Sequence, residues 1–131
     1  ESKKKIDPNT DIYLVNSYGK TKLFFKVCKT VFLGGSLIKH GGQNPLEAAR
    51  YGCRVLHGPN YWNFHEIYKL LNKYKVSSEI KSIKQLSDKV NIMLTKKNNS
   101  KIIESKIINL GDKILESTLK EINLFIEKDE N

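Results

Sequence analysis

A glycine-rich stretch between an apolar run and a helix start is the part of the chain whose residue types best suit chemistry. Gly34, Gly35, Gly41 and Gly42 can adopt left-handed backbone angles and allow main-chain N–H groups to come close to a ligand. The helix start that follows adds unpaired N–H groups and the positive end of a helix dipole, which favour anions. The stretch therefore predicts a site for a phosphate or a carboxylate.

Three polar residues add side-chain groups to this junction. Asn44 is typical of a helix N-cap, Pro45 of a first helical position, and Glu47 of the third-position partner in a capping box. Capping explains Asn44 and Glu47 without any ligand, although an N-cap amide can also face an anion. Ser36 is expected to offer a hydroxyl to a bound phosphate.

Alternating strands and helices must position this loop. We expect strands over residues 11–15, 30–33, 54–57 and 76–80, and helices over residues 18–28, 45–51, 64–74 and 83–94. The unbroken apolar run at 30–33 is typical of a strand covered on both faces. The alternation predicts an α/β fold with a Rossmann-like parallel sheet flanked by helices.

Capping-box spacing marks two further helix starts, at Asn63 with Glu66 and at Ser82 with Gln85. Residues 96–100 form a polar break that predicts a linker. After this break, apolar residues recur at helical spacing up to Ile126, on a stripe that changes face near Gly111. One long helix would satisfy this pattern, as would two helices separated near Gly111.

The net charge of +9 comes from 23 Lys and Arg residues, of which only Arg50 and Arg54 are arginines. Lysine scattered over amphipathic helices is typical of a solvated face, and it also suits an anionic lipid surface. Nucleic acid is the weaker candidate partner, because no recognised binding signature is present and specific base readout favours arginine. We therefore expect no nucleic acid partner.

Metal, redox and P-loop chemistry find little support. Cys28 and Cys53 are isolated in apolar surroundings, which predicts buried free thiols. The three histidines lack metal-ligand spacing, so we expect no metal and no cofactor. Gly19-Lys20-Thr21 resembles the end of a phosphate-binding P-loop, but Leu14 stands where that motif needs its first glycine.

An ordered series of motifs carries a family resemblance along residues 11–71. The sequence GGS is followed by four residues and GGQNPLEAA, and then by RVLHGP and NFHEI. This series resembles the C-terminal part of the 3-deoxy-D-manno-octulosonic acid (Kdo) transferases of lipopolysaccharide synthesis. The resemblance implies a GT-B glycosyltransferase that moves Kdo from CMP-Kdo to a lipid A precursor, inverting the anomeric centre without a metal.

The resemblance also implies which part of such an enzyme this is. We expect residues 1–95 to form a partial CMP-sugar binding domain and residues 96–131 a C-terminal helical segment that packs back on the fold. The chain is expected to be a fragment, inactive alone, because the catalytic base would lie on an absent N-terminal domain. No catalytic residue is assigned within the chain. The whole enzyme is expected to work at the cytoplasmic face of the bacterial inner membrane.

The donor-binding residues implied by the resemblance are those of the glycine-rich junction: Gly34, Gly35, Ser36, Gly41, Gly42, Asn44 and Glu47. Among them, Glu47 is expected to face the ribose hydroxyls of CMP-Kdo. A different class of function stays open, in which the chain is a non-catalytic anion- or nucleotide-binding module that docks on an acidic partner or a membrane surface.

Overall fold

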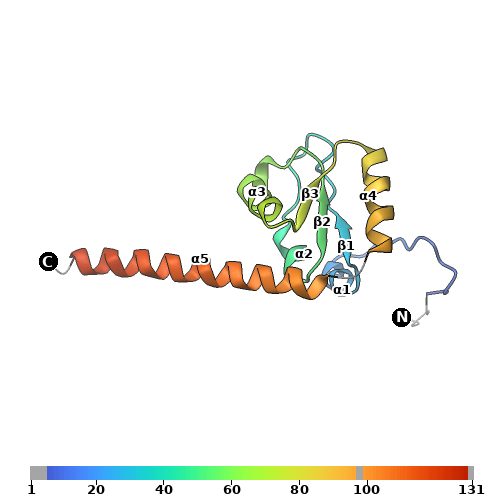
Figure 1. The fold of residues 1–131 in the computed structure, drawn as a ribbon. Coiled ribbons are helices and arrows are strands. Elements are labelled where there is room, and N and C mark those ends of the chain that lie inside the picture. The colour runs from blue at the N-terminus through green and yellow to red at the C-terminus, as the bar shows by residue number, and fades with distance from the viewer. Residues whose placement is uncertain (1–5, 97–98, 130–131) are drawn as a thin grey trace.

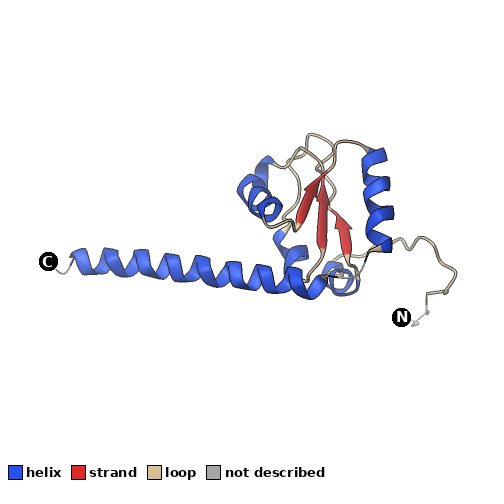
Figure 2. Cartoon of the chain, viewed as in Figure 1, coloured by secondary structure: helices blue, strands red, loops and turns tan. Residues whose placement is uncertain are grey.

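The structure, a computed structural model of the chain, describes residues 6–96 and 99–129. Figures 1 and 2 show a small sheet surrounded by helices, from which one long helix extends. In chain order, the elements are α1 (Thr21–Val27), β1 (Thr30–Phe32), α2 (Leu46–Arg50), β2 (Arg54–His57), the 3-10 helix η1 (Trp62–Phe64), α3 (His65–Lys73), β3 (Ser77–Glu79), α4 (Ile83–Thr95) and α5 (Ser100–Asp129).

The three strands form a parallel sheet in the order β1-β2-β3. Val31 lies opposite Val55, and Leu56 lies opposite Ser78. In Figure 1, α2 and α3 lie to one side of the strands and α4 lies to the other. This arrangement confirms the predicted α/β fold with a parallel sheet and flanking helices.

Position in the sheet decides how deeply each strand is buried. The central strand β2 is almost completely buried, whereas β1 is only half-buried along its length. The expectation that residues 30–33 form a strand covered on both faces was therefore wrong. An edge strand has a neighbour on one side only, and its apolar run does not reveal that.

Residues 11–15 do not form the expected strand. Ile12 and Leu14 are 87% and 84% exposed, and residues 12–17 have no regular secondary structure. A strand requires a hydrogen-bonding neighbour, and this segment pairs with none of the described strands. Its alternating β-prone side chains alone do not create one.

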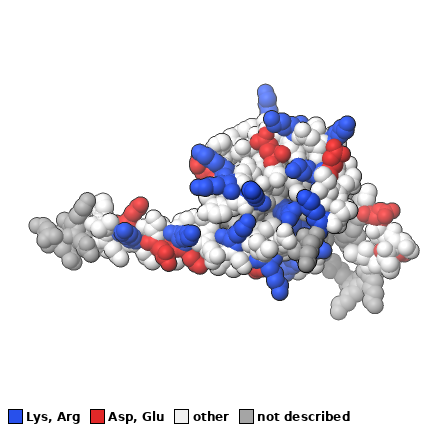
Figure 3. Space-filling model, in the orientation of Figure 1, with Lys and Arg blue, Asp and Glu red and all other residues white. Residues whose placement is uncertain are grey.

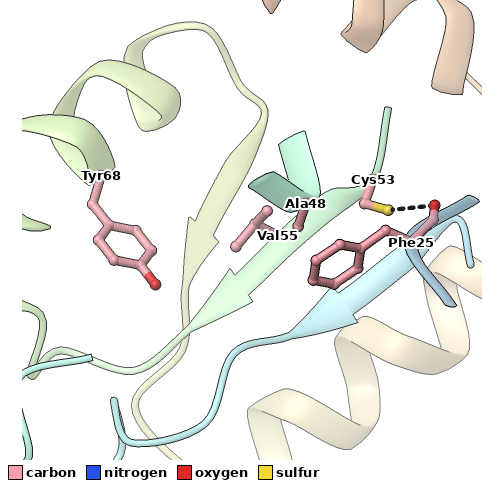
Figure 4. Packing of buried hydrophobic residues seen from close by; sticks show 5 residues of the cluster. All are labelled: Phe25, Ala48, Cys53, Val55 and Tyr68. Carbon is pink, nitrogen blue, oxygen red and sulfur yellow. Dashed lines mark hydrogen bonds between the residues drawn. The ribbon is translucent and has the colours of Figure 1, made fainter. Parts of the chain in front are cut away.

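The core consists of two clusters that meet at α2. One cluster joins α1, α2, β2 and α3 through the residues drawn in Figure 4, namely Phe25, Ala48, Cys53, Val55 and Tyr68. The other joins α2, α3 and α5 through Ala49, Leu71, Val76, Ile103 and Ile107. Because consecutive alanines of α2 serve different clusters, this short helix packs closely against both the sheet and α5.

The helix α5 runs without interruption past Gly111, which is one of the two arrangements expected. Among the residues of α5 whose burial is described, only Ile103 and Ile107 in its first turns are buried, and its C-terminal part extends away from the sheet (Figure 1). Residues 97 and 98 of the expected linker and the terminal residues 130 and 131 lie outside the described residues. The division of the chain at residues 95 and 96 stays a prediction.

Helix capping follows the sequence at α4 but not at α3. The Gln85 N–H donates to Ser82 Oγ at 3.2 Å, and Gln85 Oε1 accepts from the Lys81 N–H at 2.8 Å. The expected Asn63 cap is wrong, because η1 precedes α3 and no side chain caps that helix. The Asn63 side chain instead lies against Gly41.

The two cysteines have different environments. Cys53 is buried, and its thiol lies 3.2 Å from the Phe25 carbonyl oxygen, to which it donates (Figure 4). The Cys28 carbonyl oxygen is a second acceptor at 3.1 Å. Cys28 is exposed, so the expectation of two buried thiols was wrong for this residue. It directly follows α1 and lines a hollow together with Met93 and Leu94 of α4.

We expect iodoacetamide at pH 8 to label Cys28 quickly and to leave Cys53 intact while the protein is folded. Burial, with a smaller contribution from Cys28, raises the pKa of Cys53 to about 11, so its reactive thiolate is scarce. The protection should be roughly a hundredfold or more. Mass spectrometry of the labelled peptides measures it, with Cys28→Ser as the control. Equal labelling rates in the folded chain would contradict this structure.

Candidate functional site

The glycine loop, residues 33–45, joins the carboxyl end of β1 to α2. In open parallel sheets, ligands bind at the carboxyl ends of the strands. Gly35, Gly41 and Gly42 have φ angles of 70°, 94° and 78°, which few other residues adopt, whereas Gly34 has no positive φ. The Gly42 N–H donates to the Gly35 carbonyl at 3.0 Å and thereby draws the two glycine pairs together.

Several backbone donors of this loop have no protein partner. Within the described part of the chain, the N–H groups of Gly34, Gly35 and Gly41 donate no hydrogen bond. Gly41 is buried, so its N–H is shielded from bulk water. Unpaired N–H groups at the end of a parallel sheet favour an anionic ligand, because the ligand satisfies them.

A second segment, the exit loop of residues 58–64, supports the glycine loop. The Asn60 N–H donates to the Ser36 carbonyl at 2.9 Å, and the Asn63 N–H donates to the Gly41 carbonyl at 3.3 Å. The approach is so close that a Cβ on Gly58 would collide with the backbone of Ser36. The two loops therefore hold each other in place.

Ser36 is the polar link between these loops. Its side chain is buried, and its hydroxyl donates to the Leu33 carbonyl at 2.6 Å and accepts from the Gly58 N–H at 2.8 Å. Both bonds are internal, so in this structure the hydroxyl joins the end of β1 to the end of β2. A direct contact between Ser36 and a ligand stays a prediction.

Aromatic side chains fill the space beneath the loops. The ring of His57 lies 4.9 Å from that of Tyr61 and 4.2 Å from that of Tyr68, measured between centroids. The Tyr68 hydroxyl donates to the Gln43 carbonyl at 2.9 Å, and burial raises the pKa of Tyr68 to about 12. Tyr68 therefore stays protonated and keeps its hydrogen bond to the glycine loop at physiological pH.

Two rings of this aromatic layer, those of His57 and Tyr61, interact with polar groups next to them. His57 Nδ1 lies 2.8 Å from the Gly58 carbonyl, which can only accept, so this nitrogen carries the proton. Burial first, and then the charge and hydrogen bond of Glu79, raise the pKa of Tyr61 above its ordinary value. The His57 ring thus supports the exit loop through its hydrogen bond to the Gly58 carbonyl.

Asn44 and Glu47 lie in a different part of the site. They line a hollow of about 540 Å³ beside α1 and α2, which is formed by Lys22, Asn44, Leu46, Glu47, Arg50 and Tyr51. Asn44 Oδ1 accepts from the Leu46 N–H at 3.0 Å, but the N-cap position of α2 is occupied by Pro45, one residue later than the sequence predicted. Glu47 is 45% exposed and lies 3.9 Å from Lys22 Nζ, so the expected capping-box contact of Glu47 was wrong.

The structure therefore places the sequence-predicted residues in two groups. Ser36 and the glycine pairs lie against the exit loop, whereas Asn44 and Glu47 lie in the hollow. The sequence did not reveal Lys22 and Arg50 as cations beside Glu47. Arg50 follows Glu47 at helical spacing and could have been found, but Lys22 is brought there only by the packing of α1.

Neither a metal-binding cluster nor a membrane-spanning helix occurs in the described part of the chain. Residues 6–96 and 99–129 contain no group of three His, Cys, Asp or Glu side chains that could hold a metal ion. In the same residues, no helix is both long and apolar enough to cross a bilayer.

Curated proteins with similar sequences share one name, 3-deoxy-D-manno-octulosonic acid transferase. The protein from Haemophilus influenzae is 33% identical over 107 residues, covering 82% of this chain and 24% of the relative. The protein from Rickettsia bellii is 32% identical over 121 residues, covering 88% of this chain and 28% of the relative. The chain thus spans about a quarter of the length of these relatives. No family profile matches the chain.

A solved structure is similar in fold. It is the C-terminal CMP-Kdo binding domain of WaaA from Acinetobacter baumannii, with a TM-score of 0.68 and 25% sequence identity. The match covers 76% of this chain and 52% of that chain. The resemblance indicated by the sequence motifs is therefore confirmed at the level of sequence and of fold.

Alanine substitutions at two glycines test which of them the fold itself requires. Gly34→Ala should change the free energy of unfolding by less than about 0.5 kcal/mol, because its Cβ would point into open space. Gly41→Ala should destabilise by at least about 1–2 kcal/mol, since its φ is 94° and its Cβ would collide with Asn63. Urea denaturation measures both, and equal destabilisation would contradict the loop geometry.

Proposed function

Because the chain resembles the C-terminal, donor-binding part of the Kdo transferases in sequence and in fold, we propose that it binds CMP-Kdo for the transfer of Kdo to a lipid A precursor. The observation that carries this proposal is the match to a CMP-Kdo binding domain over 76% of the chain. The whole protein would be an inverting GT-B glycosyltransferase, of which this chain supplies the donor side.

The glycine loop would bind the anionic part of the donor. The unpaired N–H groups of Gly34, Gly35 and Gly41 would donate hydrogen bonds to the phosphate or the sugar carboxylate, with Gly42 allowing the close approach. Ser36 would hold the loop in this shape through its two buried hydrogen bonds. The helix dipole adds little here, because α2 has only 5 residues.

The hollow beside α1 and α2 would receive the nucleoside. Its volume of about 540 Å³ falls within the ordinary range of small-molecule sites. Glu47 would accept hydrogen bonds from the ribose hydroxyls, and the Asn44 amide would face the adjoining phosphate. Lys22 and Arg50 contribute positive charge at the rim, where an anionic nucleotide would enter.

Catalysis by the whole protein would divide between two parts. Backbone donors on this chain would stabilise the charge that develops on the departing CMP phosphate. A general base that deprotonates the acceptor hydroxyl would come from the part of the protein beyond this chain. The chain alone is therefore expected to bind donor without transferring Kdo.

In this proposal the enzyme works at the cytoplasmic face of the inner membrane, where it meets its acceptor, the lipid A precursor. Figure 3 shows lysines spread over the globular part of the chain, while α5 mixes positive and negative side chains. Such a basic surface would attract an anionic leaflet by about 1 kcal/mol per well-placed cation.

Nucleotide selectivity tests the function directly. In isothermal titration calorimetry, the chain should bind CMP at least about tenfold more tightly than UMP or AMP, a difference of about 1.4 kcal/mol. The preference should persist in 1 M salt, which screens exposed charges over about 3 Å. A basic docking module would instead bind anionic vesicles at low salt and release them at high salt. Its affinity for a nucleotide would not depend on the base. Equal affinity for the three nucleotides would overturn the proposal.

A second test concerns Glu47. Glu47→Gln should weaken CMP binding by roughly one to two orders of magnitude, because a charged hydrogen bond contributes about 1.5–3 kcal/mol. Stability should change by less than about 1 kcal/mol, since the pair with Lys22 is solvent-exposed and 3.9 Å long. Glu66→Gln, in the first turn of α3, is the matched control and should leave both quantities unchanged. If Glu47→Gln unfolded at a lower temperature but bound CMP with unchanged affinity, the role of Glu47 would be structural only.

A further inference from the structure

Two side chains of η1 converge on the glycine loop at Gly41. A Cβ built on Gly41 would lie 2.9 Å from Trp62 Nε1 and still closer to the amide nitrogen of Asn63. Both atoms are hydrogen-bond donors. Within the described residues, neither side chain donates a hydrogen bond to the protein.

The positions of Trp62 and Asn63 are not explained by a contribution of their side chains to the stability of the fold. Trp62 is 56% exposed, although a large aromatic ring usually gains stability from burial. Asn63 stands just before α3, where its amide could cap the helix, and α3 has no side-chain cap. A cap contributes about 1 kcal/mol, yet the Asn63 amide faces the glycine loop instead.

The backbone fixes these two side chains beside Gly41. The Asn63 N–H donates to the Gly41 carbonyl at 3.3 Å, and the Phe64 N–H donates to the Tyr61 carbonyl at 3.0 Å. Tyr61 in turn stacks on His65 with ring centroids 5.6 Å apart. Both donors therefore already lie beside Gly41, whose own N–H has no protein partner, in the structure without a ligand.

We infer that Trp62 Nε1–H and the Asn63 amide bind the anionic group of the donor together with the Gly41 N–H, which makes the exit loop the second wall of the donor site. This inference rests on the proposed function and adds specific residues to it. The exit loop contains no Lys or Arg, so its contribution comes from neutral N–H donors. Neutral donors bind a phosphate or a carboxylate by hydrogen bonds that salt screens only weakly.

Fluorescence provides a direct measurement, because Trp62 is the single tryptophan of the chain. With excitation at 295 nm, CMP and inorganic phosphate should each shift the emission of Trp62, with phosphate acting at higher concentration. Cytidine, which lacks the phosphate, should produce little change at concentrations where CMP saturates. A response to cytidine without any response to phosphate would assign Trp62 to the base and overturn the anion contact.

Variants test the contact independently by calorimetry with CMP. Asn63→Asp keeps the size of the side chain but replaces two donors with a negative charge, so CMP affinity should fall by at least about tenfold. Trp62→Phe keeps an aromatic ring without the N–H, and a loss of roughly threefold to tenfold is expected. Asn123→Asp on the exposed part of α5 changes the net charge equally and should leave affinity unchanged.

The outcomes separate this inference from the proposed function. If the unaltered chain binds CMP selectively but the Trp62 and Asn63 variants bind it equally well, the inference is wrong and the proposed function stands. If the unaltered chain binds no CMP, both are overturned. Thermal unfolding of each variant checks that a loss of binding does not come from a loss of folding.

Discussion

The close contact between the glycine loop and the exit loop is the constraint on which the rest of the site depends. The buried Ser36 hydroxyl bonds to Leu33 and Gly58 at the same time, and so ties together the ends of two adjacent strands. Glycine is required wherever this approach is tightest, because a Cβ at Gly58 or Gly41 would collide with the opposite loop. Once these loops are fixed, the unpaired N–H groups are fixed with them, which is the preorganisation that the proposed anion site requires.

Packing beneath the loops explains why the site does not collapse. Tyr68 is anchored in the core and holds the Gln43 carbonyl, while His57 at the end of β2 holds the Gly58 carbonyl. A buried phenol with a pKa of about 12 cannot ionise in the physiological range, so this support is insensitive to pH.

Two further features of the fold are exposed surfaces, one at the edge of the sheet and one on α5. Among the described residues, no strand pairs with the outer side of the edge strand β1, and the side chains of Ile12, Tyr13 and Leu14 are exposed. The later part of α5 presents exposed apolar residues such as Leu115, Leu119 and Ile122. Surfaces of this kind are unusual in an isolated domain, because exposed apolar area lowers solubility. They accord with a chain that spans about a quarter of the length of its relatives.

The sequence by itself determined the alternation of strands and helices, the parallel sheet and the glycine loop between β1 and α2. These features depend on local patterns: apolar runs, helical spacing and the Ser82 cap, which act over a few residues. Tertiary structure alone decided that β1 is an edge, that Cys28 is exposed, that Lys22 lies beside Glu47, and that Asn63 faces Gly41 rather than capping α3. Each of these depends on which segments distant in sequence come together. A sequence pattern shows the chemical type of each residue. Which partners its polar groups find depends on tertiary packing, which brings distant segments together.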